Sequence, residues 1–202
     1  MRYITLKNKL SNIYFTPHDI RIAGFKYSSL AMSRWTKKGL IRKIRNGLYV
    51  FIDRESELDV RELAGILVEP SYVSMESALH MAGLIPEVVF ATTSITTKLP
   101  KSYTTYLGEV YYRHVSPKLF FGYISVEGPN QPYYLAEPEK ALLDYIYLNS
   151  NIDNRDAVVG LRLDPETVTN LDHKKLDQYL QIFNNKRVTH IINQIRKIHV
   201  IN

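Results

Sequence analysis

Residues 28–52, SSLAMSRWTKKGLIRKIRNGLYVFI, constrain the fold of this chain more than any other stretch. The stretch opens with a serine pair that can cap the start of a helix. Leu30, Ala31 and Trp35 then share one side of that helix at 3.6 residues per turn, which predicts a side that packs on a core. Gly39 suits the left-handed position that ends a helix. The opposite side is mostly polar and carries Ser29, Met32, Ser33, Thr36 and Lys37.

Two short alternating runs, residues 40–45 and 48–52, follow this helix. Asn46-Gly47 lies between them, and this dipeptide is preferred in two-residue hairpin turns in which both central residues have positive φ. A helix with a polar, basic outer face followed at once by a basic hairpin is typical of the second half of a winged helix-turn-helix. In that arrangement the helix enters the DNA major groove and the hairpin lies along the phosphates.

The distribution of charge favours the same interpretation. Residues 1–54 hold twelve Lys and Arg against Asp19 and Asp53, a net charge of +10, whereas residues 55–202 carry −4. Basicity confined to one segment indicates a polyanion-binding module joined to a body with another role. The alternative is a basic face that is merely solvated.

Composition narrows the class of protein further. The chain has no cysteine, which excludes disulfides, thiolate nucleophiles and cysteine metal sites and fits a reducing compartment. The first ten residues lack the apolar core of a signal peptide, and no apolar run approaches the roughly 20 residues that span a bilayer. We therefore expect a cytoplasmic protein with no membrane partner.

The sequence as a whole predicts an α+β protein of two domains, residues 1–54 and 55–202. The acidic residues 53–59 are typical of a linker, and residues 151–164 of a loop. Strands at 88–93, 110–115 and 120–126 predict a small antiparallel sheet in the second domain. Helices are expected at 2–13, 18–23, 60–68, 75–81, 140–149, 172–183 and 188–198.

The residues placed to contact DNA come from the predicted helix and hairpin. Trp35 shares the apolar side, so core packing is expected for it rather than base stacking. Arg34 lies between the two sides and can contact a phosphate or pair with an acid. In the hairpin, alternation places Lys43 and Arg45 on one face and Arg42 on the other. The predicted DNA-binding residues are Ser29, Ser33, Arg34, Thr36, Lys37, Arg42, Lys43, Arg45 and Asn46.

Nothing in the sequence assembles a catalytic, metal or cofactor site. The segment Glu137-Pro138-Glu139-Lys140 resembles the acids and lysine of metal nucleases, but it lies at a helix start, where acids are stabilised by the helix dipole. Asp144 is one turn from Lys140, a spacing that predicts a modest stabilising ion pair. The six histidines are scattered, with no two at the spacing of a helical zinc site.

Two apolar helices end the chain, and we expect them to pack on the β-rich body or on another chain. A basic cluster would then lie on their outer face and extend the surface available to DNA. Its members are Lys186, Arg187, Arg196 and Lys197.

Three landmarks in order resemble the AbiEi family: Lys38–Ile41 followed by Arg45–Val50, Pro70–Leu79 followed by Gly83–Pro86, and Ala136–Asp144. This family comprises the antitoxins and transcriptional regulators of AbiE-type toxin–antitoxin systems, which act in phage defence. The resemblance covers roughly residues 1 to 150. It implies a winged helix that binds inverted repeats of double-stranded DNA in its own promoter. It also implies a C-terminal part that is associated with neutralising a nucleotidyltransferase toxin.

The function expected from sequence is therefore that of a non-enzymatic transcriptional autorepressor and antitoxin. Two alternatives stay open. One is an enzyme, either a nuclease that finds its site with a winged helix or a nucleic-acid-modifying protein. The other is a regulator whose body senses a ligand.

Overall fold

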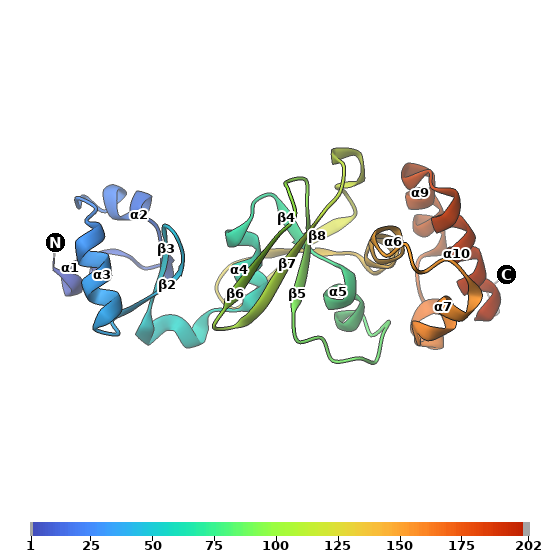
Figure 1. Cartoon of the computed structure of the whole chain (residues 1–202), viewed down its shortest axis with the longest axis horizontal. Coiled ribbons are helices and arrows are strands. Elements are labelled where there is room, and N and C mark those ends of the chain that lie inside the picture. Colours follow the sequence, from blue (N-terminus) through green and yellow to red (C-terminus); the bar gives the residue numbers. More distant parts are fainter. Residues whose placement is uncertain (1, 200–202) are drawn as a thin grey trace. The chain divides into compact units, whose positions relative to one another are not determined.

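The structure, a computed structural model, describes residues 2–199 of the chain (Figure 1). It is an α+β protein, as the sequence predicts, and it divides into two compact units, Met1–Asp59 and Val60–Asn202. We call these the first and the second unit. The division falls a few residues after the expected boundary at residue 54, because the acidic segment that follows the hairpin belongs to the first unit.

The first unit consists of short helices and a small sheet, in the order α1(Tyr3–Lys9), β1(Tyr14–Phe15), α2(Pro17–Ile22), α3(Ser29–Lys37), β2(Ile41–Arg45), β3(Leu48–Phe51) and the 3-10 helix η1(Ile52–Glu57). A capping box between Thr16 and Asp19 begins α2, and the Ser28 hydroxyl accepts a hydrogen bond from the Ala31 amide to begin α3. The first helix ends at Lys9, before the expected end at residue 13, because the backbone is already extended at Leu10.

The three strands of the first unit pair in the antiparallel order β1-β3-β2. The predicted hairpin is present, but its turn differs from the predicted one. Gly47 has a φ of +76°, whereas Asn46 is not among the described residues with positive φ. The register also shifts between Lys43 and Arg45. A single glycine with positive φ and a nearby β-bulge are typical of hairpin loops longer than two residues. In such hairpins one strand contains an extra residue, which forms the bulge.

One stripe of α3 faces the core of the first unit. Ala31, Met32 and Trp35 are buried, while Leu30 is 68% exposed. Placing Leu30 on the inner side and Met32 on the outer side was therefore wrong, although the inner placement of Trp35 is confirmed. The stripe packs with residues from all parts of the unit, among them Leu6, Phe15, Ile20, Ile41, Tyr49 and Phe51.

The segment that was expected to be a linker is held against the first unit. The Arg54 guanidinium donates hydrogen bonds to the carbonyl oxygens of Leu10 (2.7 Å), Ser11 (3.2 Å) and Asn12 (2.9 Å), which follow the end of α1. Asp53 forms an ion pair with Lys7 at 2.6 Å. These contacts explain why residues 53–57 form an ordered 3-10 helix and not a linker.

The second unit is built on a six-stranded sheet in the order β6-β7-β5-β4-β9-β8. The pairs β4–β9 and β5–β7 are parallel and the other three are antiparallel, so the expected antiparallel sheet is in fact a mixed one. The strands are β4(Ser71–Val73), β5(Thr92–Thr96), β6(Lys101–Thr105), β7(Gly108–His114), β8(Tyr123–Val126) and β9(Tyr133–Ala136).

Helices pack on this sheet and on one another: α4 contacts β4, β5, β7 and β9, and α6 contacts β9, α5, α9 and α10. The last helices share one core with the sheet, which confirms that they pack on the body. The segment predicted as a loop at 151–164 contains α7. The helices are α4(Val60–Leu67), α5(Met75–Met81), α6(Pro138–Leu148), α7(Arg155–Gly160), α8(Pro165–Thr169), α9(His173–Phe183) and α10(Lys186–Ile198), with a 3-10 turn η2(Pro117–Leu119).

The two arginines of the basic cluster predicted on α10 have partners within the second unit, so the four residues do not form one exposed basic surface. The Arg187 guanidinium donates to four carbonyl oxygens, two at the end of α6 and two beyond it, those of Ile146, Tyr147, Asn149 and Ile152. Arg196 pairs with Asp177 of α9 at 2.8 Å. Only Lys186 and Lys197 of the four are exposed, because the two arginines hold helices together.

Replacing Arg54 tests this account of the first unit. Arg54→Met should lower the free energy of unfolding of the first unit by about 1.5–3 kcal/mol, because it removes charge-assisted hydrogen bonds to carbonyl oxygens. Trp35, the single tryptophan, lies in that core and reports its unfolding by fluorescence in denaturant. The control is Arg34→Met, an exposed arginine without a side-chain partner among the described residues, which should change stability by less than about 0.5 kcal/mol. Equal effects would contradict the account.

Candidate functional site

The outward side of α3 carries the predicted DNA-contacting residues. Ser29, Ser33, Arg34 and Lys37 are exposed, and within residues 2–199 their side chains form no hydrogen bond or ion pair. Ser33, Arg34 and Lys37 are spaced so that they lie on one face of the helix. Thr36 is also exposed, but its hydroxyl donates to the Met32 carbonyl oxygen at 2.9 Å and lies beside the buried stripe. Thr36 is therefore the least available of the five.

The four predicted residues of the hairpin differ in their contacts, and Asn46, in the turn, is exposed. The Arg42 guanidinium makes two hydrogen bonds to the Glu55 carboxylate, of 2.7 and 3.1 Å. Lys43 is exposed, and no carboxylate pairs with it in the part of the chain that is described. Arg45 is half-buried and donates to the carbonyl oxygen of Asn46 at 3.2 Å, next in sequence. Among these basic side chains, Lys43 is the one most available to an anion.

The register shift in β2 also affects the predicted faces of the hairpin. Strict alternation across Lys43, Ile44 and Arg45 was the basis for placing Lys43 and Arg45 together. The shift between these two residues breaks the alternation, and their exposures differ accordingly.

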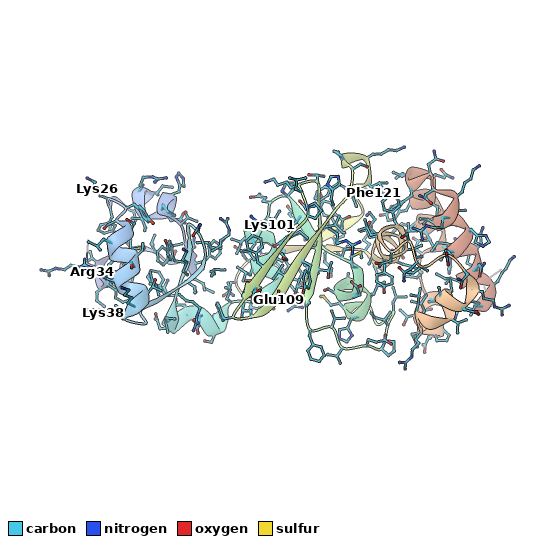
Figure 2. All side chains as sticks on the ribbon, viewed as in Figure 1. Lys26, Arg34, Lys38, Lys101, Glu109 and Phe121 are labelled. Atoms are coloured by element: carbon cyan, nitrogen blue, oxygen red, sulfur yellow. The ribbon has the colours of Figure 1, made fainter. Side chains whose placement is uncertain are left out.

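The first unit is strongly positive also when its charge is counted to the boundary seen in the structure, Asp59. Met1–Asp59 contains twelve Lys and Arg against five Asp and Glu, a net charge of +7, and the second unit carries −1. Several of these acids have partners within the unit: Asp19 in the capping box of α2, Asp53 with Lys7, and Glu55 with Arg42. Figure 2 places Lys26, Arg34 and Lys38 on α3 and the segments adjoining it, and within residues 2–199 none of the three forms an ion pair with an acid.

The second unit encloses a buried polar cluster. Lys140, Asp144 and Ser74 have no exposed surface, and Tyr72 is 1% exposed. Asp144 pairs with the Lys140 ammonium and accepts hydrogen bonds from the hydroxyls of Tyr72 (3.0 Å) and Ser74 (2.9 Å). The Lys140 ammonium also donates to the Tyr72 hydroxyl at 2.8 Å and lies about 5 Å from the ring centres of three aromatics, Tyr72, Phe121 and Phe183.

This cluster is more than the modest helical ion pair that the spacing predicts. Burial raises the pKa of Asp144 and lowers that of Lys140, while their mutual attraction opposes both shifts. Ser74 precedes α5 as expected, but its hydroxyl is directed to Asp144 and does not cap the helix. No atom of the ion pair reaches the surface, and the cluster joins α6 to Tyr72 of β4 and to Ser74.

The two acids of the nuclease-like segment connect α6 to α9. Glu137 accepts hydrogen bonds from the Lys175 ammonium, at 2.8 Å, and from the Tyr179 hydroxyl. Burial disfavours its charged form, but these hydrogen bonds outweigh burial and lower the pKa of Glu137. Glu139 accepts from the backbone amide of Asp172 at 2.8 Å, just before α9 begins. Both acids therefore have structural partners.

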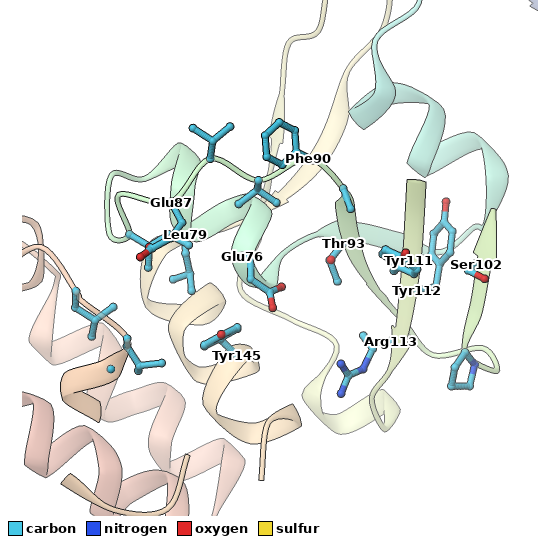
Figure 3. Close-up of a pocket in the computed structure, with 18 of the residues that line it drawn as sticks. Glu76, Leu79, Glu87, Phe90, Thr93, Ser102, Tyr111, Tyr112, Arg113 and Tyr145 are labelled. Atoms are coloured by element: carbon cyan, nitrogen blue, oxygen red, sulfur yellow. The ribbon is translucent and has the colours of Figure 1, made fainter. Parts of the chain in front are cut away.

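A hollow of about 1010 Å³ lies in the second unit, between α5, β7, α6 and the segment before β5. Figure 3 shows Glu76 directed into it from α5, with Tyr145, Thr93 and Arg113 around the carboxylate. Burial and the neighbouring carboxylates of Glu76 and Glu87 raise the pKa of Tyr145. The hollow combines apolar walls with the half-buried carboxylate of Glu76 and the basic side chains of Lys101 and Arg113.

Across residues 2–199, no three His, Asp or Glu side chains gather where they could hold a metal ion. The longest helix in the described range, α10, has 13 residues, fewer than the roughly 20 needed to cross a bilayer. No protein-family model matches the chain, and no curated protein matches it.

Variants of the buried ion pair test its structural role. Lys140→Met and Asp144→Asn should each destabilise the second unit by about 3–5 kcal/mol, because each leaves a buried charge without its partner. The double variant should cost less than the sum by about 1 kcal/mol or more, since it leaves no charge behind. Far-UV circular dichroism in denaturant measures this, with Trp35 fluorescence reporting the first unit separately. Additive costs would contradict the coupling.

Proposed function

We propose that this chain is a DNA-binding transcriptional regulator whose first unit is a winged helix. The order of helix, strand, helix, helix and hairpin supports this, and so does the pairing of β1 with β3 beside the hairpin. The observation that carries the proposal is the outward face of α3. It presents serine, arginine and lysine side chains without partners among the described residues, on a unit of charge +7.

Each part of this surface has a separate role in the proposal. α3 enters the major groove, where Ser33, Arg34 and Lys37 reach base edges or the flanking phosphates. The hairpin follows the backbone, with Lys43 as its main phosphate contact. Arg42 contributes less, because its guanidinium is occupied by Glu55.

The biological role that we propose rests on the resemblance to AbiEi regulators. The chain would repress its own operon by binding an inverted repeat, and the second unit would contact a nucleotidyltransferase toxin in a phage-defence system. The contacts of Glu137, Glu139 and Lys140 favour a structural role for these residues over the nuclease alternative. The hollow beside Glu76 is the feature that would serve the ligand-sensing alternative.

Binding of the full chain to DNA tests the proposal directly. Its affinity for the DNA upstream of its own gene should exceed that for random duplex at least tenfold, and log affinity should fall linearly with log salt. Fluorescence anisotropy over a series of salt concentrations measures both. Equal affinity for both duplexes would contradict the proposed repressor role. An affinity that does not depend on salt would contradict the proposed phosphate contacts.

The neighbouring residues Arg42 and Lys43 offer an internal comparison. Lys43→Ala should weaken binding to all duplexes about equally and lower the salt slope by about one, the value for one lost phosphate contact. Arg42→Ala should have a smaller effect, because Glu55 already holds that side chain. Lys118→Ala, an exposed lysine of the second unit, is the matched control and should leave binding unchanged. A larger effect of Arg42→Ala than of Lys43→Ala would contradict the assignment.

A further inference from the structure

One apolar side chain lies on the outward face of α3. Leu30, in the first turn of the helix, is 68% exposed, although the same helix buries Ala31, Met32 and Trp35. Ser33, Arg34 and Lys37 follow Leu30 by three, four and seven residues, so they lie on the same face of the helix, and all three are exposed. Leu30 is thus an apolar group surrounded by polar and basic side chains on the face that we propose to enter DNA.

Exposure alone does not indicate a role, since single apolar residues are common on surfaces. Ile4 of α1 and Ile22 of α2 are also exposed, by 61% and 73%. What distinguishes Leu30 is its place beside the unpaired cations of α3. The surface around it is complementary to a polyanion, so the partner that covers it should be negatively charged and should also present an apolar group.

The major groove of DNA meets both conditions. Its edges carry phosphates, and its floor displays one apolar substituent, the C5-methyl group of thymine. In helix-turn-helix proteins the N-terminal residues of the recognition helix contact base edges. Leu30 lies in that part of α3. Hydroxyl and ammonium groups such as those of Ser33 and Lys37 cannot make an apolar contact with a methyl group.

We propose that Leu30 is a specificity-determining residue that recognises a thymine through its C5-methyl group. This inference rests on the proposed function, because it assumes that α3 lies in the major groove. Burying one methyl-sized apolar group contributes about 0.8 kcal/mol, which corresponds to roughly a fourfold change in affinity. The contribution should therefore be measurable at a single base pair.

The test uses the full chain and a duplex selected by it from a random pool. Each thymine of the selected duplex is replaced in turn by deoxyuridine, which removes only the C5-methyl group. Replacement at the contacted position should weaken binding of the unaltered protein about fourfold. Leu30→Ala should bind the thymine duplex less tightly and should no longer distinguish thymine from deoxyuridine at that position. Leu30→Met, which keeps an apolar side chain, should retain most of the distinction.

The control variant is Ile4→Ala, which removes a similarly exposed aliphatic side chain from α1 and should leave the thymine preference intact. Trp35 fluorescence verifies that each variant keeps the core of the first unit. If Leu30→Ala shows the full deoxyuridine effect, the inference is wrong while the proposed function stands. The same holds if Leu30→Ala binds DNA normally but fails to bind a protein partner. If the unaltered chain does not bind duplex DNA, the proposed function and this inference both fail.

Discussion

The burial of one stripe of α3 determines the arrangement of the first unit. Ala31, Met32 and Trp35 provide the packing surface on which α1, α2 and the small sheet come together. A nine-residue helix that buries one stripe must present the opposite one to solvent. That opposite side carries the polar and basic Ser33, Arg34 and Lys37, together with the apolar Leu30. Within residues 2–199, no ion pair joins the outward cations of α3 to an acid, and Asp53 and Glu55 pair with Lys7 and Arg42.

The second unit depends on a different interaction, the enclosed pair of Lys140 and Asp144. An ion pair without solvent contact is costly unless its remaining hydrogen-bonding capacity is met, and here the hydroxyls of Tyr72 and Ser74 meet it. Ser74 and Tyr72 come from the β4 region, and Lys140 comes from α6. The cluster thus joins segments almost seventy residues apart and favours one arrangement of helix on sheet.

The sequence allowed the helices of this fold to be predicted better than its sheet. The predicted bounds of α5 match those observed because periodicity, a polar start and Gly83 agree at that position. β4 was missed because three residues carry too little alternation to be recognised. The parallel pairs of β4 with β9 and of β5 with β7 join segments distant in sequence, so local patterns could not indicate them.

The candidate site shows the same limits at the level of single residues. Because α3 is short, its sequence left the direction of its buried side uncertain by about one residue. The prediction therefore placed Leu30 on the buried side and Met32 on the exposed side. The partnership of Arg42 with Glu55 could not be predicted, because Glu55 was assigned to a linker. The burial of Lys140 did have a signal: Ala141, Leu142, Leu143 and Ile146 follow it in the same helix and are all fully buried. A lysine within so apolar a helix is more consistent with an enclosed pair than with an exposed one.

Hydrogen–deuterium exchange of the full chain, with and without duplex DNA, tests the central claim most directly. The claim is that the outward face of α3 and the adjoining hairpin form the DNA-binding surface. DNA should slow exchange of backbone amides in residues 28–46 and leave those of residues 60–199 unchanged. Slowed exchange confined to the second unit, or none in α3 and the hairpin at saturating DNA, would contradict the account.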